Sequence, residues 1–95
     1  MGRFLVVVTL RLDRPYAHWQ DRFDADRGPR ESVGIFDVFR AAVVGEQSAI
    51  YAVRTDNPRL IHDYIYDPAM RPAIAESGFV IGSERIVVSE ELTDG

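Results

Sequence analysis

The chain has 95 residues, the length of one small domain, with 46% hydrophobic and 27% charged residues. Its net charge of −4 argues against nucleic acid or an acidic membrane surface as a partner, since both require a basic face. The absence of cysteine excludes disulfides, thiolate metal ligands and a cysteine nucleophile, and fits the cytoplasmic location that we expect.

The first predicted element is a strand at Phe4–Leu10, an apolar and β-branched run without alternation. Such a run is typical of a strand buried on both faces. Asp13 as a cap and Pro15 in the first turn then predict a helix from Arg14 to Arg27. We expect Gly28-Pro29 to end this helix.

The middle of the chain predicts an antiparallel hairpin. Two extended runs, Val33–Val44 and Ala49–Arg54, are separated only by Gly45–Ser48. A turn centred on Glu46 and Gln47 would leave both faces of the hairpin mainly apolar.

That turn also fixes an expected register within the hairpin. It places Ala42 opposite Tyr51 and Phe39 opposite Arg54. It also puts Asp37 diagonally across from Arg54, where the two charges would pair.

The last third of the chain predicts a broken helix and a final strand. Asn57 provides a cap and Pro58 the first helical position. Asp67-Pro68 repeats this start signal, so the helix should break or kink there. Gly78 closes it, and Phe79–Val88 is the fourth predicted strand.

The order β-α-β-β-α-β predicts one ferredoxin-like α+β domain over residues 1–90 and a loose tail over 91–95. This fold has a four-stranded antiparallel sheet with both helices on one face. Right-handed crossovers favour strands one and four side by side in the centre. Two helices cover only one face of a sheet that is apolar on both, so we expect a homodimer through the helix-free face.

Some positions carry a family resemblance: Trp19 and Phe23-Asp24 in the first helix, and Ser77-Gly78 before the last strand. With the element order and length, they resemble the dimeric α+β barrel superfamily. This group includes antibiotic-biosynthesis monooxygenases, muconolactone isomerase-like enzymes, small polyketide cyclases and stress-responsive proteins. The resemblance implies a cleft between helices and sheet that takes a small aromatic or apolar molecule.

The candidate substrate-binding residues are aromatic: Trp19, Phe23, Tyr51 and Tyr64. They would line the cleft that the resemblance implies. The ordinary alternative is that aromatic side chains at helical spacing pack in the core.

His62 and Arg40 are the candidate catalytic residues. The ordinary pKa of histidine suits proton transfer near neutral pH, although an exposed helix histidine is the simpler interpretation. Arg40 interrupts an apolar strand face, so it would bind an anionic ligand or pair with an acid across the dimer. No spaced ligand set or phosphate-binding loop is present, so we expect neither a metal nor a cofactor.

These features predict a small-molecule enzyme acting on an aromatic or polyketide-like compound, of the cofactor-free monooxygenase, isomerase or cyclase type. A non-catalytic ligand-binding or stress-associated protein and a dimer without a pocket are the open alternatives. A cavity of about 300 Å³ or more between helices and sheet would favour the first two.

Overall fold

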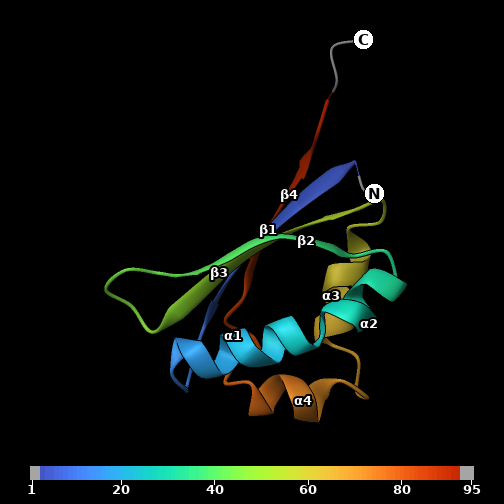
Figure 1. Cartoon of the computed structure of the whole chain (residues 1–95). Coiled ribbons are helices and arrows are strands. Elements are labelled where there is room, and N and C mark those ends of the chain that lie inside the picture. The colour runs from blue at the N-terminus through green and yellow to red at the C-terminus, as the bar shows by residue number, and fades with distance from the viewer. Residues whose placement is uncertain (1–2, 93–95) are drawn as a thin grey trace.

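The computed structural model describes residues 3–92 of the chain and contains eight elements (Figure 1). In chain order these are β1 (Phe4–Arg11), α1 (Tyr16–Ala25), α2 (Arg27–Ser32), β2 (Phe36–Ala42), β3 (Ser48–Thr55), α3 (Arg59–Ile65), α4 (Arg71–Glu76) and β4 (Arg85–Glu90).

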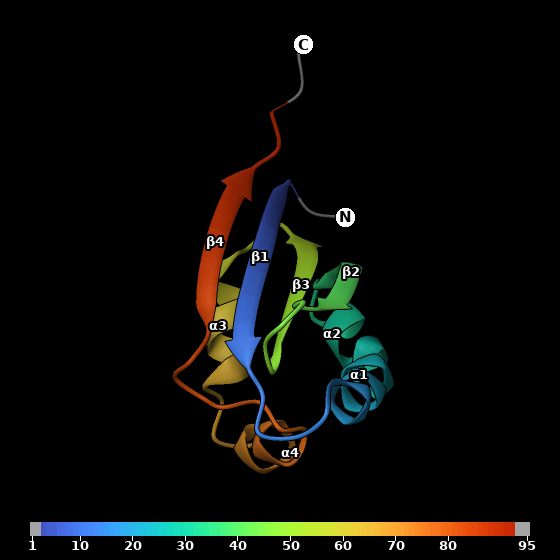
Figure 2. The ribbon, with the colours of Figure 1, turned by 90° about the vertical axis from the view of Figure 1, so that its left-hand side faces the viewer.

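The strands form one antiparallel sheet in the order β2-β3-β1-β4, and all four helices lie on one side of it (Figures 1 and 2). This is the predicted ferredoxin-like architecture. The prediction that strands one and four share the centre is wrong in part: β1 and β4 are paired, but β4 is an edge strand. The central pair is β1 and β3, whose entire lengths face each other.

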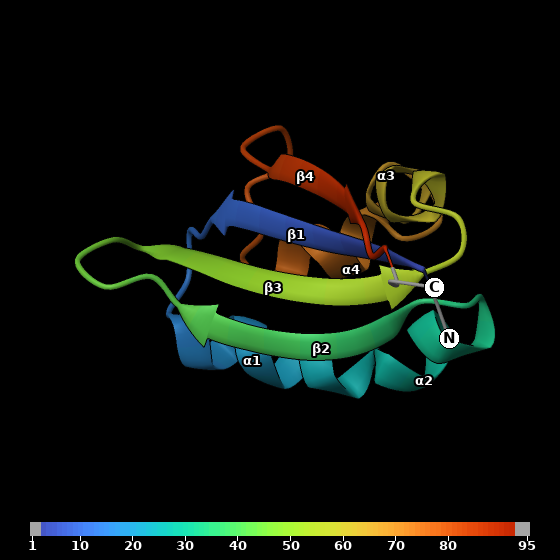
Figure 3. The same cartoon turned by 90° about the horizontal axis from the view of Figure 1, so that it is seen from above.

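Strand register sorts the side chains of the central pair onto two faces. Val6 lies opposite Val53 and Val8 opposite Tyr51, and all four are buried beneath the helices. Val7 points to the opposite face, because neighbouring side chains of a strand alternate between its two faces. The helices lie behind the sheet when this face is viewed (Figure 3).

The hairpin register differs from the prediction by two residues: Ala42 pairs with Ala49, and Phe39 with Ala52. A β-bulge then adds Val38 between Asp37 and Phe39. The extra residue shifts the alternation of side chains by one position in the part of β2 that precedes it. Asp37 therefore points toward the helices instead of away from them.

The first helical region is two helices instead of the predicted Arg14–Arg27 helix. Asp13 does not cap α1; its backbone N–H donates to Gly78 O at 2.8 Å. Gly28-Pro29 does not end the helical region, because Pro29 falls in the first turn of α2, where its missing N–H costs nothing.

The predicted break at Asp67-Pro68 is confirmed, because α3 ends at Ile65 and α4 begins at Arg71. The helix α3 begins one residue later than predicted: Pro58, and not Asn57, is in the cap position, and Arg59 is the first helical residue. The Asn57 side chain still accepts from the backbone N–H of Arg59 at 3.2 Å. The final strand starts later than predicted: Phe79 makes only an isolated bridge to Leu12, and a turn precedes β4.

The C-terminal region is described only to Leu92. Glu91 donates its backbone N–H to Arg3 O, and its carboxylate pairs with Arg54. Arg54 therefore does not pair with Asp37 as predicted. Residues 93–95 of the predicted tail lie outside the described residues.

Candidate functional site

A cavity of about 60 Å³ lies between the helices and the sheet. This volume has room for a few water molecules and is smaller than the 300 Å³ expected of a preformed ligand site. The polar side chains in its wall come from Arg22, Asp26, Arg30, Tyr51, Tyr64 and Ser77. The apolar ones come from Phe23, Ile35, Ile61, Ile65, Ala73, Ile74 and Phe79.

Tyr64 brings a buried hydroxyl to this cavity from α3. No hydrogen bond with acceptable geometry reaches the hydroxyl from residues 3–92, although the Arg30 guanidinium lies near it. Burial raises the pKa of Tyr64, and the negative charge of Asp26 adds to the effect. The phenol therefore stays protonated at neutral pH and can donate a hydrogen bond to an oxygen placed in the cavity.

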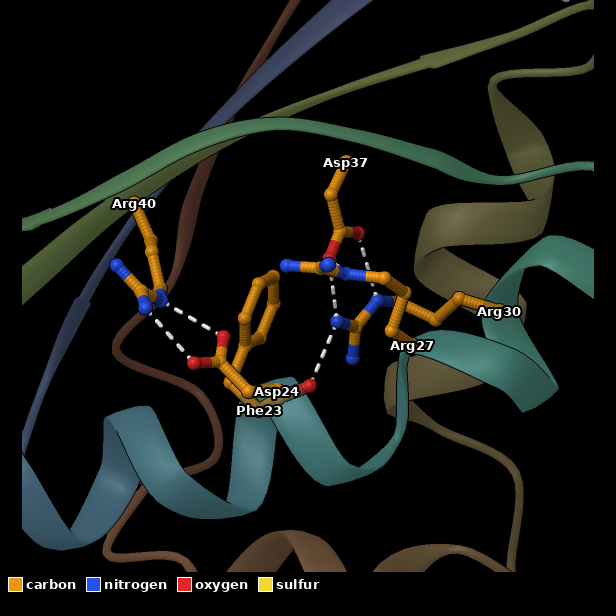
Figure 4. Close-up of polar contacts among 6 residues, drawn as sticks. All are labelled: Phe23, Asp24, Arg27, Arg30, Asp37 and Arg40. Carbon is orange, nitrogen blue, oxygen red and sulfur yellow. Dashed lines mark hydrogen bonds and ion pairs between the residues drawn. The ribbon is translucent and has the colours of Figure 1, made fainter.

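Arg30 is the buried cation of the site, with only 5% of its surface exposed. Its Nε donates to Asp37 Oδ1 at 2.9 Å, and its Nη2 donates to Asp37 Oδ2 at 2.8 Å (Figure 4). The same Nη2 donates to the backbone oxygen of Phe23 at 2.6 Å. These contacts fix the guanidinium and compensate its burial.

The aromatic ring of Phe23 contacts two other aromatic rings, stacked on Trp19 and tilted against Tyr51. It is 4.8 Å from the Trp19 ring and 4.8 Å from the Tyr51 ring, measured between centroids. The Arg30 guanidinium carbon lies 3.7 Å from the centre of the same ring. Such a cation–π contact is favourable when water is excluded.

Three of the four predicted substrate-binding residues line the cavity: Phe23, Tyr51 and Tyr64. Trp19 does not; it is buried behind Phe23 as part of the core. Burial also raises the pKa of Tyr51, which keeps that phenol neutral.

Arg40 lies outside the cavity wall, in a surface groove of about 410 Å³ between the first two helices and β2. Its Nε and Nη2 donate to the two carboxylate oxygens of Asp24, each at 2.7 Å (Figure 4). The expected acid is therefore on the same chain, in α1. These hydrogen bonds, reinforced by the positive charge of Arg40, lower the pKa of Asp24.

His62 is not brought to the cavity. Its side chain is 65% exposed on α3 and stacks on Tyr66, with ring centroids 4.6 Å apart. Tyr66 in turn donates a hydrogen bond to Glu84. The catalytic role predicted for His62 stays a prediction.

Arg30, Asp26 and Ser77 line the cavity but were not among the predicted site residues. The predicted end of the helix at Gly28-Pro29 left Arg30 in a loop, and no local pattern marks its contact with Asp37. The sequence does place Phe23, Arg30 and Asp37 seven residues apart. This spacing brings the three side chains together only because α2 carries Arg30 and the β-bulge turns Asp37 toward the helices.

No helix within residues 3–92 is long and apolar enough to cross a membrane. The same residues contain no group of three or more His, Asp or Glu side chains arranged to hold a metal ion.

Sequence comparison gives no match, either to a family model or to a curated protein. Structural comparison does. A putative antibiotic biosynthesis monooxygenase from Caulobacter crescentus superposes with a TM-score of 0.63 at 16% identity, covering 97% of this chain and 92% of the other. SnoaB, a cofactor-independent oxygenase from Streptomyces nogalater, gives 0.59 at 8% identity, covering 98% and 96%.

A third similar structure is a dimeric protein of unknown function and ferredoxin-like fold from Bacteroides fragilis. Its TM-score is 0.52 at 18% identity, with 92% of this chain and 94% of the other covered. At such identities the likeness establishes the fold. This chain therefore has the ferredoxin-like fold found in antibiotic-biosynthesis-monooxygenase-like proteins, as the resemblance implied.

Proposed function

We propose that this protein is a small-molecule enzyme that oxidises an aromatic or polyketide-like compound without a cofactor, using the cavity beneath the sheet. The Tyr64 hydroxyl carries this proposal, because it is buried in a mainly apolar cavity and accepts or donates no hydrogen bond of good geometry within residues 3–92. An unsatisfied buried group of this kind costs about 1–3 kcal/mol, a cost that a bound oxygen would remove. The similarity to a cofactor-independent oxygenase supports the same reaction class.

In this proposal the ligand is a phenol whose oxygen accepts a hydrogen bond from Tyr64. The nearby Arg30 cation, fixed by Asp37, favours the phenolate form in a site with little water. The electron-rich ring then reacts with dioxygen. One oxygen atom joins the ring and the other leaves as water with the phenolic hydrogen and the hydrogen at the attacked carbon, so that a phenol and dioxygen become a quinone and water.

The test uses 1-naphthol as substrate in air, with no added cofactor, and follows oxygen uptake and 1,4-naphthoquinone formation. We expect Tyr64→Phe to lower kcat/KM by roughly tenfold, the effect of one lost hydrogen bond. The same variant should unfold at an equal or higher temperature, because the unsatisfied hydroxyl is gone. Unchanged kcat/KM in Tyr64→Phe would remove Tyr64 from the reaction.

His62→Ala serves as the comparison variant. Its side chain is exposed and lies outside the cavity wall. Unchanged turnover in His62→Ala ends its predicted role as an acid or base, whereas a large loss would restore it and contradict the site proposed here.

The second candidate function is ligand binding without chemistry. It is favoured by the titratable lining of the cavity, which within residues 3–92 consists of Arg22, Asp26, Arg30 and the two tyrosines, with no histidine. Binding of 1-naphthol without oxygen uptake would support this function over the enzyme.

We also propose that the active form is a homodimer joined through the helix-free face of the sheet. The strand register puts Leu5, Val7 and Ile50 on this face, with the more exposed Phe39 and Val87 beside them. Figure 3 looks onto the same face of the sheet. Burying such a face gains about 25 cal/mol per Å² of apolar surface. The dimeric neighbour of the same fold supports this arrangement.

A further inference from the structure

We propose that Phe23 is a gate: its ring occupies the place of a ligand ring and separates the small cavity from the surface groove. This inference rests on the proposed function, since it concerns the ligand of the same site. It explains how a cavity of about 60 Å³ can serve a compound with fused aromatic rings.

Phe23 lies in the wall of the cavity and also in the wall of the surface groove. Among the described residues it is the one side chain that lines the cavity and also the groove of about 410 Å³. The groove is lined by Phe23, Asp24, Arg27, Glu31, Asp37, Val38, Phe39 and Arg40. Figure 4 shows the Phe23 ring between the Asp24–Arg40 pair and the Asp37–Arg30 pair. Moving one ring would therefore join the two spaces.

The side chains around the Phe23 ring are kept in position by contacts that do not involve Phe23. Trp19 is almost fully buried, and Arg30 is fixed by both oxygens of Asp37. Tyr51 completes the place from β3. If the Phe23 ring leaves, an aromatic surface and a cation remain, and they would receive another flat ring in its position.

Phe23 is also placed to move. It lies in the last turn of α1, two residues before the helix ends at Ala25, and is only partly buried. The adjoining groove offers the half-exposed side chains of Val38 and Phe39, against which the displaced ring can pack. A side-chain rotation suffices, so the helix need not unfold.

The geometry therefore points to an electron-rich, planar ligand of at least two fused rings. One ring takes the place of Phe23 over Arg30, and an oxygen on the deeper ring meets the Tyr64 hydroxyl. Electron-rich rings bind a guanidinium more strongly than electron-poor ones. A single-ring phenol would gain less from opening the gate.

The experiment measures binding of 2-naphthol and phenol by titration calorimetry in the absence of dioxygen. Phe23→Ala removes the gate, Phe23→Leu keeps an apolar side chain with less bulk, and Ile61→Ala enlarges the cavity away from the groove. We expect Phe23→Ala to bind 2-naphthol at least tenfold more tightly than the native chain. On the scale of log affinity, Phe23→Leu should gain more than half as much as Phe23→Ala, and Ile61→Ala less than half as much. Equal gains in Phe23→Leu and Ile61→Ala would overturn the gate even if Phe23→Ala does not fold.

A second readout uses the native chain with 4-fluorophenylalanine at its five phenylalanine positions. The ¹⁹F resonance of Phe23, assigned by its loss in Phe23→Leu, should shift toward its solvent-exposed value when 2-naphthol saturates the protein. If 2-naphthol binds and the ¹⁹F resonance of Phe23 does not shift, Phe23 is not a gate, whereas the proposed function still stands. Failure of 2-naphthol to bind any variant overturns the gate and the cavity site together.

Discussion

At the scale of single residues, Asp37 binds two arginines. Its carboxylate binds the buried Arg30 through two hydrogen bonds, and Arg27 Nε donates to it as well, at 3.3 Å. Asp24 forms an equally regular pair with Arg40, but about a third of each side chain is exposed. The two pairs have the same chemistry and differ in burial, so they can be compared directly.

Replacing Asp37 should therefore cost far more stability than replacing Asp24. Asp37→Ala leaves the Arg30 charge buried and unpaired, which costs about 3–5 kcal/mol. Asp24→Ala removes an ion pair whose side chains are each about a third exposed and should cost at most about 1 kcal/mol. Urea unfolding measures both free energies, and equal costs would contradict the role of burial assigned here.

Asp24 should also give a defined dependence of stability on pH. Arg40 holds the folded pKa of Asp24 below its ordinary value of 3.8. Its contribution is therefore complete above the ordinary pKa and is lost as the pH falls through the lowered folded pKa. The difference in unfolding free energy between the native chain and Asp24→Asn should be steady from pH 5 to 7 and shrink as the pH is lowered below 3.8. A difference that grows on acidification would show the opposite sign.

At the scale of elements, the segment from α4 to β4 is held against the start of α1 at Gly78. This residue has a φ of +95° and accepts the backbone N–H of Asp13. A Cβ on Gly78 would lie 2.8 Å from the Cβ of Arg14. Backbone conformation and packing thus both require glycine at this junction.

Gly78→Ala should destabilise the fold by about 1–3 kcal/mol, because it combines a strained φ with a steric clash. Gly28→Ala is the matched control: Gly28 lies in α2 and has no positive φ, and apart from its own helix and chain neighbours no atom of residues 3–92 lies within 4 Å of its added Cβ. The control should be neutral or more stable by about 0.5–1 kcal/mol. Thermal unfolding of both variants checks the prediction, and similar melting temperatures would refute it.

At the scale of the whole molecule, the helices shelter one face of the sheet and leave an apolar face outside. Val87 is 59% exposed and Phe39 is 46% exposed on the uncovered side. The proposed dimer gives these side chains a partner surface of the same kind. Its two-fold symmetry would place Val7, on the central strand β1, near the middle of the interface.

Val7→Glu should convert the dimer to a monomer with little change in the fold, because the side chain points away from the helices. An unpaired carboxylate in the interface should weaken association by at least tenfold. Val44→Glu adds the same charge in the hairpin turn, where the valine is 97% exposed, and should leave the dimer intact. Light scattering coupled to size-exclusion chromatography distinguishes the two variants, and a native chain that is monomeric at high concentration would contradict the dimer.

The sequence by itself determined the order of elements, the break at Asp67-Pro68 and three of the cavity residues. These features depend on patterns within a few positions: apolar periodicity, capping side chains and proline. Phe23, Tyr51 and Tyr64 were expected in the cleft because the family resemblance implies one between helices and sheet, and they do line the cavity; their role in binding a substrate stays a prediction.

Only the tertiary structure decided the hairpin register, the two-helix form of the first crossover and the pairing of Arg30 with Asp37. The bulge at Val38 turns Asp37 to the helix side, and α2 brings Arg30 beneath it. The tertiary structure likewise pairs Arg40 with Asp24 and leaves His62 outside the cavity wall. Each of these outcomes depends on which distant group lies opposite a side chain after folding, and local sequence patterns carry no information about that partner.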